Sequence, residues 1–196
     1  MSFDQREFRD AVARFPTGVA VVTARDDQGE LLGVTVNSVT SVSLQPALMS
    51  FSLGKHLHSL QKFIDVQHFA INVLREDQHA ISTRFATAGS DKWAAVSPDV
   101  GVFGCPIIRP NVAAFECERY ACYEGGDHLI FIGRVLRLET ADHGEPLVFY
   151  RSRYHRVSRP VNGCSGKPEA GGRNPSADGP PRFVHQEETV DVNQDR

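Results

Sequence analysis

The sequence predicts a mainly β protein, an antiparallel barrel with short flanking helices. Short apolar runs rich in β-branched residues recur along the chain, and turn sequences at 26–29 and 124–127 separate neighbouring runs. The helical patterns between the runs are short and do not alternate regularly with the strands, as they would in a parallel sheet. Consecutive hairpins with only short helices favour a closed antiparallel barrel.

Composition indicates one globular domain with an ordinary surface charge. The chain has 196 residues, of which 41% are hydrophobic, so it can build a sizeable core but has little room for two folds. The formal net charge is −3, and the lysines and arginines are scattered rather than gathered into a stripe. We therefore expect no nucleic-acid partner.

Nothing in the sequence is typical of membrane insertion or secretion. No window approaches about 18 consecutive apolar residues, and residues 1–6 lack the basic and apolar regions of a secretory signal. We expect a cytoplasmic protein that does not bind a membrane.

The cysteines and histidines lack the spacing of a metal site. The four cysteines, at positions 105, 117, 122 and 164, form no Cys-x-x-Cys pair. His56 and His58 form a His-x-His pair, but no acidic residue or thiol lies near them in the sequence. We expect no metal site, and free thiols in a reducing compartment.

The chain is expected to open with an amphipathic helix and a β-hairpin. Ser2 and Gln5 have the spacing of a capping box, and the apolar residues that follow recur with helical spacing. The apolar stripe of this helix needs a sheet to cover it. The hairpin strands are predicted at 18–23 and 32–36, on either side of the turn at 26–29.

The remaining elements are predicted from runs and alternations of apolar residues. In chain order they are a strand at 48–53, a helix at 57–64, a strand at 69–74, a helix capped by Asp77 that ends by Gly89, two long strands within 112–140, and a strand at 147–150. The paired glycines Gly125 and Gly126 permit the positive φ angles of a tight turn between the two long strands.

The composition changes after about residue 157. Glycine, proline and small polar residues dominate from there, so segment 158–196 has little to bury and is expected to be a disordered tail. Its last residues regain slight apolar character and either dock on the barrel or stay untethered. We expect the folded domain to span residues 1–157.

Short polar side chains gather where the second strand of the first hairpin ends. Hydroxyl and amide groups occupy most positions from 35 to 43, among them Thr35, Asn37 and Ser38. So many hydrogen-bonding side chains are more typical of a site that binds a phosphate or the polar edge of a ring than of a hydrophobic core. The same residues can instead form an Asx or Ser turn at a strand end, with no ligand.

The sequence lacks the usual glycine loops of nucleotide-binding folds. It has no G-x-G-x-x-G after a strand, no G-x-x-x-x-G-K-[ST] and no G-x-S-x-G, which excludes a Rossmann domain. A barrel rim can still hold a flavin through backbone donors, hydroxyls, a cation and an apolar wall. No nucleophile with an adjacent base is visible, and hydride transfer between two cofactors needs none.

Several segments resemble the short-chain flavin reductases, which supply reduced flavin to two-component monooxygenases. The resemblance runs through five landmarks, in the order and spacing of that family, over about residues 5 to 157. They are the stretch 15–53, Phe69-Ala70-Ile71-Asn72-Val73-Leu74, Phe85-Ala86 with Asp91-Lys92-Trp93, Gly126-Asp127-His128 with Gly133-Arg134-Val135, and Pro146-Leu147-Val148-Phe149-Tyr150.

This resemblance implies an antiparallel split β-barrel, the FMN-binding split barrel, which dimerises and holds flavin near the subunit interface. It also implies a set of flavin contacts at the ring, ribityl chain, phosphate and adenosine. The residues implied are Thr35, Val36, Asn37, Ser38, Ser52, Leu53, Ser59, Arg84 and Phe85. Without the resemblance, Ser59 reads as a surface helix residue and Arg84 as part of a solvated face.

His128 is implied as the catalytic residue. In the family the Gly-Asp-His segment lies where nicotinamide must stack on the flavin, so His128 is expected to contact the pyridine nucleotide, with Asp127 as its orienting partner or a turn residue. A histidine at a turn is otherwise commonly a hydrogen-bonded surface residue.

The function implied is that of an NAD(P)H-dependent flavin reductase. Hydride would pass from NADH or NADPH to FMN or FAD, and the reduced flavin would diffuse to a separate monooxygenase. Two alternatives remain: a split-barrel oxidase with tightly bound flavin, which would purify yellow, and a non-catalytic flavin- or haem-binding barrel, which would not consume NAD(P)H.

Overall fold

The computed structural model describes residues 3–89 and 91–157. The segment 158–196, for which the sequence predicts a disordered tail, lies outside the described residues. Within the described part the chain is mainly β and its sheets are antiparallel, which confirms the predicted fold class.

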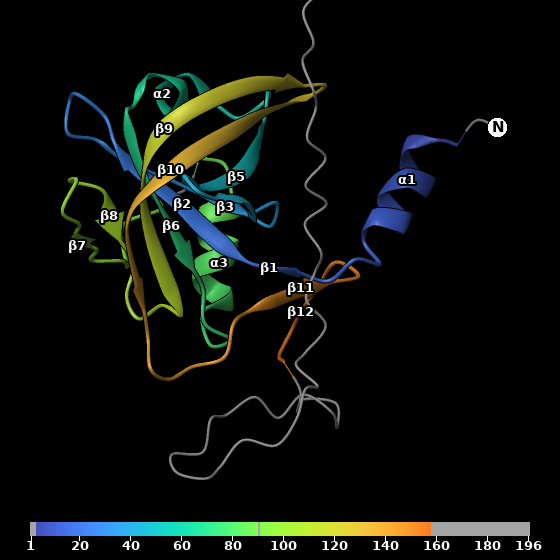
Figure 1. Cartoon of the computed structure of the whole chain (residues 1–196). Coiled ribbons are helices and arrows are strands. Elements are labelled where there is room, and N and C mark those ends of the chain that lie inside the picture. The colour runs from blue at the N-terminus through green and yellow to red at the C-terminus, as the bar shows by residue number, and fades with distance from the viewer. Residues whose placement is uncertain (1–2, 90, 158–196) are drawn as a thin grey trace, which may run out of the picture. The chain divides into compact units, whose positions relative to one another are not determined.

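A seven-stranded antiparallel sheet forms the barrel and curls around the core (Figure 1). In order across the sheet its strands are β3 (Leu31–Val36), β2 (Ala20–Arg25), β6 (His68–Val73), β9 (Ala113–Gly125), β10 (His128–Thr140), β5 (Ala47–Gly54) and β4 (Thr40–Leu44). The predicted hairpins, β2–β3 and β9–β10, are both present.

Smaller sheets and three helices accompany the barrel. One sheet joins β1 (Thr17–Gly18), β11 (Val148–Tyr150) and β12 (Arg153–His155), and another joins β7 (Asp99–Val100) and β8 (Pro106–Ile107). The helices are α1 (Gln5–Val12), α2 (Leu60–Asp65) and α3 (His79–Ala86). In the described residues no helix is long and apolar enough to cross a membrane.

The connection between β3 and β4 forces the large sheet to curl. These two strands are its opposite edges, yet they are joined by residues 37–39 alone. Four Cα–Cα steps from Val36 to Thr40 span at most about 15 Å. The edges of a flat seven-stranded sheet would lie about 29 Å apart. The sheet therefore has to bring its two edges together beside this connection, which we call the link.

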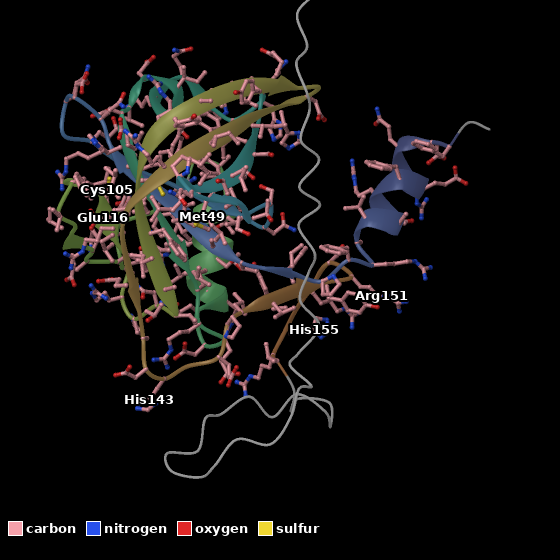
Figure 2. All side chains as sticks on the ribbon, in the orientation of Figure 1. Met49, Cys105, Glu116, His143, Arg151 and His155 are labelled. Atoms are coloured by element: carbon pink, nitrogen blue, oxygen red, sulfur yellow. The ribbon has the colours of Figure 1, made fainter. Side chains whose placement is uncertain are left out.

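Aromatic rings fill the centre of the barrel. Phe51 lies 5.1 Å from both Phe131 and Phe69, measured between ring centroids, stacked on the first and edge-on to the second. All three rings are almost fully buried. Met49 on β5 and Glu116 on β9 belong to the barrel, Cys105 directly precedes β8, and Arg151 and His155 belong to the β11–β12 hairpin (Figure 2).

One buried amide ties the core to the loop after β8. Asn72 on β6 donates to the carbonyl of Val21 at 3.1 Å and to the Thr23 hydroxyl at 3.0 Å, and its oxygen accepts from the Ile108 N–H at 2.9 Å. Asn72 is fully buried, and its oxygen supplies the acceptor that the Ile108 N–H needs in the core.

Two helix starts differ from the sequence prediction. The capping box of α1 is formed by Asp4 and Glu7 rather than by Ser2 and Gln5, because each carboxylate accepts the backbone N–H of the other residue. The N-cap of α3 is Gln78 instead of Asp77, whose carboxylate pairs with Arg75.

The apolar stripe of α1 was predicted to cover a sheet, and this prediction was wrong for the single chain. No residue of α1 is buried. Phe8 is 57% exposed and Val12 is 54% exposed, and Phe15 after the helix is 74% exposed. An amphipathic helix thus presents its apolar side to solvent.

Removing the Asn72 amide should cost stability, because Asn72→Ala leaves the Ile108 N–H buried without an acceptor. We expect the free energy of unfolding in urea to fall by about 2 to 4 kcal/mol. The exposed residue Gln28 offers the control, since Gln28→Ala should stay within about 0.5 kcal/mol of the parent protein. Equal unfolding midpoints for the two variants would contradict this role of Asn72.

Candidate functional site

One serine fastens the link to β5, the strand that pairs with β4. The Ser38 hydroxyl accepts from the Ser52 N–H at 2.9 Å and donates to the Ser52 carbonyl at 3.4 Å. Both groups of one β5 residue are therefore held by a side chain that follows β3. Asn37, the preceding residue, is exposed, and its amide has no hydrogen-bond partner among the described residues.

A cleft of about 330 Å³ opens beside the link, and we call it the central cleft. Seven of the ten residues that the sequence predicted line it: Thr35, Val36, Asn37, Ser38, Ser52, Leu53 and His128. They come from the ends of β3 and β5, the link, and the start of β10. Residues separated by 90 positions in the chain thus meet around one cleft.

His128 is placed by the tight turn of the β9–β10 hairpin. Gly126 in that turn has φ +74°, which favours glycine, and His128 then pairs with Gly125 on one side and Gly54 on the other. Its Nδ1 lies 2.7 Å from the Asp127 carboxylate. This hydrogen bond lowers the pKa of Asp127 and leaves Nε2 as the ring nitrogen available to a ligand.

A second cavity, of about 490 Å³, lies further along β3, and we call it the loop cavity. Ser59 lines it together with His58, Lys92 and Trp93. The Lys92 ammonium donates to the carbonyls of Gly33 and Phe85, both at 3.0 Å, and burial lowers its pKa. Lys92 thus joins the end of α3 to β3 and adds a cation to the wall of this cavity.

Phe85 and Arg84 are not on these cavities. The Phe85 ring is fully buried and lies edge-on to Trp93 at 4.8 Å. It packs where Gly33 has no side chain, since a Cβ at Gly33 would lie 2.3 Å from this ring. Arg84, in the last turn of α3, lines neither the central cleft nor the loop cavity.

Sequence reasoning missed several residues of the site. Gly54 at the end of β5 lines the central cleft, as do His56 and Leu57 after it, and Lys92 lines the loop cavity. His56 had been weighed only as a metal ligand. A third cavity, against β3, is lined in part by Tyr154, which lies beyond the last predicted strand.

The arrangement suits a site that binds a polar planar ligand better than a site that hydrolyses a bond. Hydroxyl and amide groups line the central cleft, Leu53 and Val36 add apolar wall, and the two histidines His56 and His128 also line it. In residues 3–89 and 91–157 no cluster of three or more metal-ligating side chains is present. Such a site can bind and orient a ring whose chemistry resides in the ligand itself.

Comparison with known proteins identifies the family. Residues 12–158 match the model of the family described as "Flavin reductase like domain". The chain belongs to this family, as its sequence landmarks predicted.

Individual relatives agree with this family. A Rhizobium meliloti (strain 1021) protein named "Probable flavin reductase" is 45% identical over 139 residues, which are 71% of this chain and 45% of that protein. "FMN reductase (NADH) SmoA" of Agrobacterium fabrum is 41% identical over 156 residues, covering 80% of this chain and 88% of the relative. This chain therefore spans less than half of the first relative and most of the second.

A solved structure has the same fold. The NADH:FAD oxidoreductase SgcE6 of Streptomyces globisporus, in complex with NAD and FAD fragments, superposes with a TM-score of 0.75. It is 36% identical, and the match covers 79% of this chain and 93% of that one.

The ionisation of Asp127 tests the geometry of the turn. Because the His128 hydrogen bond lowers the pKa of Asp127, His128→Ala should raise that pKa toward the ordinary aspartate value. Carbon-detected NMR titration of the Asp127 carboxylate measures the change. His58→Ala, at the loop cavity, is the control and should leave it unmoved; an unchanged Asp127 pKa in His128→Ala would refute the pairing.

Proposed function

We propose that this protein is an NAD(P)H-dependent flavin reductase, which transfers hydride from NADH or NADPH to FMN or FAD. The observation that carries the proposal is the central cleft, where polar groups of the link face an apolar wall and His128. Membership of the flavin reductase family supports it, as do relatives named for NADH-dependent reduction of FMN and FAD.

The polar groups of the cleft match the needs of a flavin. Thr35 and Asn37 offer hydrogen bonds to a heteroaromatic ring, while Val36 and Leu53 provide apolar surface for its faces. The loop cavity continues along β3 from the central cleft and offers Lys92 and Ser59 for phosphate. We assign it to the phosphate of FMN or to the phosphates and adenosine of FAD.

Hydride transfer is chemistry that the two nucleotides supply when both are bound. The protein's residues hold the rings in register and keep the cleft walls in place. Asp127 orients His128, whose Nε2 would be available to hold the nicotinamide ring of NADH or NADPH. Ser38, fixed to Ser52, keeps the link from moving when ligands enter and leave.

The product, reduced flavin, would be passed to a separate flavin-dependent monooxygenase. Relatives support this partner class, since one is named "Flavin-dependent trigonelline monooxygenase, reductase component" and another "Flavin-dependent monooxygenase, reductase subunit HsaB". The flavin is then a substrate that binds and leaves, rather than a resident cofactor.

We infer a cytoplasmic location for this reaction. The three cysteines in the described part, Cys105, Cys117 and Cys122, are free. Free thiols, two of them buried, are typical of a reducing compartment.

We also propose a homodimer in which apolar surface of one chain is covered by a second copy. Phe8 and Val12 on α1 are each more than half exposed, and so are Tyr120, Tyr123 and Leu138 on the β9–β10 hairpin. A second copy that covers such exposed apolar side chains would remove them from water.

Sedimentation velocity tests the dimer. The wild-type chain should sediment as a dimer at micromolar concentration, and Phe8→Glu should shift it toward monomer because it places a charge in the covered face. Arg9→Glu, on the same helix, is the control and should remain dimeric. A wild-type monomer that reduces flavin at full rate would contradict the dimer proposal.

One set of assays tests the activity. NADH and NADPH oxidation should each be measured with FMN, with FAD and with riboflavin. We expect turnover that depends on added flavin, in protein that purifies without colour. Yellow protein that keeps flavin through dialysis would instead indicate a tightly bound cofactor, and no NAD(P)H consumption would contradict catalysis.

Two alanine variants should separate the two ligands. Asn37→Ala removes a hydrogen-bonding group and should weaken flavin binding by about twofold to 150-fold. His128→Ala should raise KM for NADH or lower kcat while leaving the flavin Kd nearly unchanged. Flavin titration without NADH, steady-state kinetics and melting curves distinguish these effects. If His128→Ala changes only the melting temperature, then the histidine is structural.

A further inference from the structure

The loop cavity follows β3 away from the central cleft. Its lining runs from Gly33 back through Leu31 to Glu30, which directly precedes the strand. The central cleft lies at the other end of β3, where Thr35 lines it. Leu31 and Thr35 are four residue steps apart, which is about 13 Å along an extended strand. A ligand that occupies both spaces is therefore long.

Lys92 marks the place of a phosphate between the two ends of β3. Its ammonium has three N–H donors, and the carbonyls of Gly33 and Phe85 take two of them at 3.0 Å. One N–H and the positive charge remain for an anion. With a flavin ring at Thr35, the phosphate at the end of the ribityl chain would lie near Gly33. FMN has no atoms beyond that phosphate, whereas the cavity continues to Glu30.

The loop cavity is also larger than one phosphate group. It measures about 490 Å³, whereas a cavity of about 150 Å³ holds one benzene molecule. Cavities of about 300 to 1,000 Å³ are typical of sites that hold whole small molecules. A phosphate beside Lys92 would therefore leave most of the loop cavity to another part of the ligand.

The start of β3 gives the cavity an apolar wall that suits a purine. Leu31, Leu32 and Trp93 line the cavity there. The indole N–H of Trp93 donates to the Leu31 carbonyl at 2.9 Å, and the Trp93 ring lies edge-on to Phe85 with centroids 4.8 Å apart. The indole is thus held at the start of β3, and the wall has a fixed position.

Glu30 adds a hydrogen-bond acceptor to this end of the cavity. Its N–H donates to the Asp26 carboxylate at 2.8 Å, and its Oε2 pairs with Lys62 on α2. In the part of the chain that the structure describes, the other oxygen of Glu30, Oε1, has no hydrogen-bond partner. Asp91 is a second carboxylate in the lining. Carboxylates accept hydrogen bonds and repel anions, so this end suits a neutral group that carries donors.

We propose that the loop cavity binds the adenosine of FAD, that FAD is therefore preferred to FMN, and that Glu30 sets this preference. Adenosine combines a flat purine with an amino group and two ribose hydroxyls, and these donors match a carboxylate. Relatives are named for FMN and for FAD, so the family does not decide between the two flavins. This assignment rests on the proposed function and extends it to the choice of flavin.

Flavin titrations without NADH test the assignment. Wild-type protein should bind FAD at least about tenfold more tightly than FMN. Glu30→Gln keeps the size of the side chain and removes its charge, so the ratio of the FMN Kd to the FAD Kd should fall by about two- to tenfold. Asp27→Asn is the matched control, because it removes a carboxylate from the same turn but outside the loop cavity, and the ratio should stay within about twofold.

Adenosine alone reports on the cavity without a mutation. It should compete with FAD and leave the FMN Kd unchanged, because FMN does not reach the start of β3. Adenosine that competes with both flavins alike or with neither, or wild-type protein that binds FMN as tightly as FAD, would overturn the assignment. An unchanged Kd ratio in Glu30→Gln would overturn the role of Glu30. A wild-type protein that binds no flavin and oxidises no NADH would instead overturn the proposed function.

Discussion

The link between β3 and β4 is the constraint on which the rest of the molecule depends. Three residues join the two edges of a seven-stranded sheet, and a chain that short cannot cross a flat sheet of this width. The sheet curls and its edges approach each other, and the Ser38 hydroxyl fixes the link to both backbone groups of Ser52 on β5. Barrel closure and the candidate site thus have one origin.

The same constraint explains why polar residues gather at the site. The pairing of β5 with β4 ends at Ser50, so the backbone groups of Ser52 need a side-chain partner, which the Ser38 hydroxyl supplies. Ser38 serves this structural purpose, whereas the Asn37 amide has no partner among the described residues. A residue with a structural role and a residue available to a ligand can therefore be neighbours. The two interpretations of residues 35–43, a strand-end turn and a ligand site, are compatible.

Sequence patterns located the parts of the site that belong to long elements. The turn at 26–29 and the paired glycines before His128 have strong local signals, and both hairpins formed as predicted. Phe85 shows the limit of this reasoning. The Phe85 ring fits in the core because Gly33 on β3 has no side chain. Local sequence patterns do not show that residues of two different elements fit together in this way.

Short elements were harder to predict. Strand β12 has three residues, of which Arg153 and His155 are polar, so it has too little apolar character to be recognised. Tyr154 was missed for this reason. The wrong prediction for α1 has a different cause. The sequence predicts that the helix has an apolar stripe, but it does not indicate whether the same chain or a second copy covers that stripe.

The central claim is that flavin lies along β3 beside the link, with its ring in the central cleft. A crystal structure of the full chain soaked with oxidised FMN tests this most directly. The account predicts the ring against Thr35 and Asn37, with His128 near its nicotinamide-binding face. Ring density on the outer face of the β9–β10 hairpin, with the cleft beside the link empty, would contradict it.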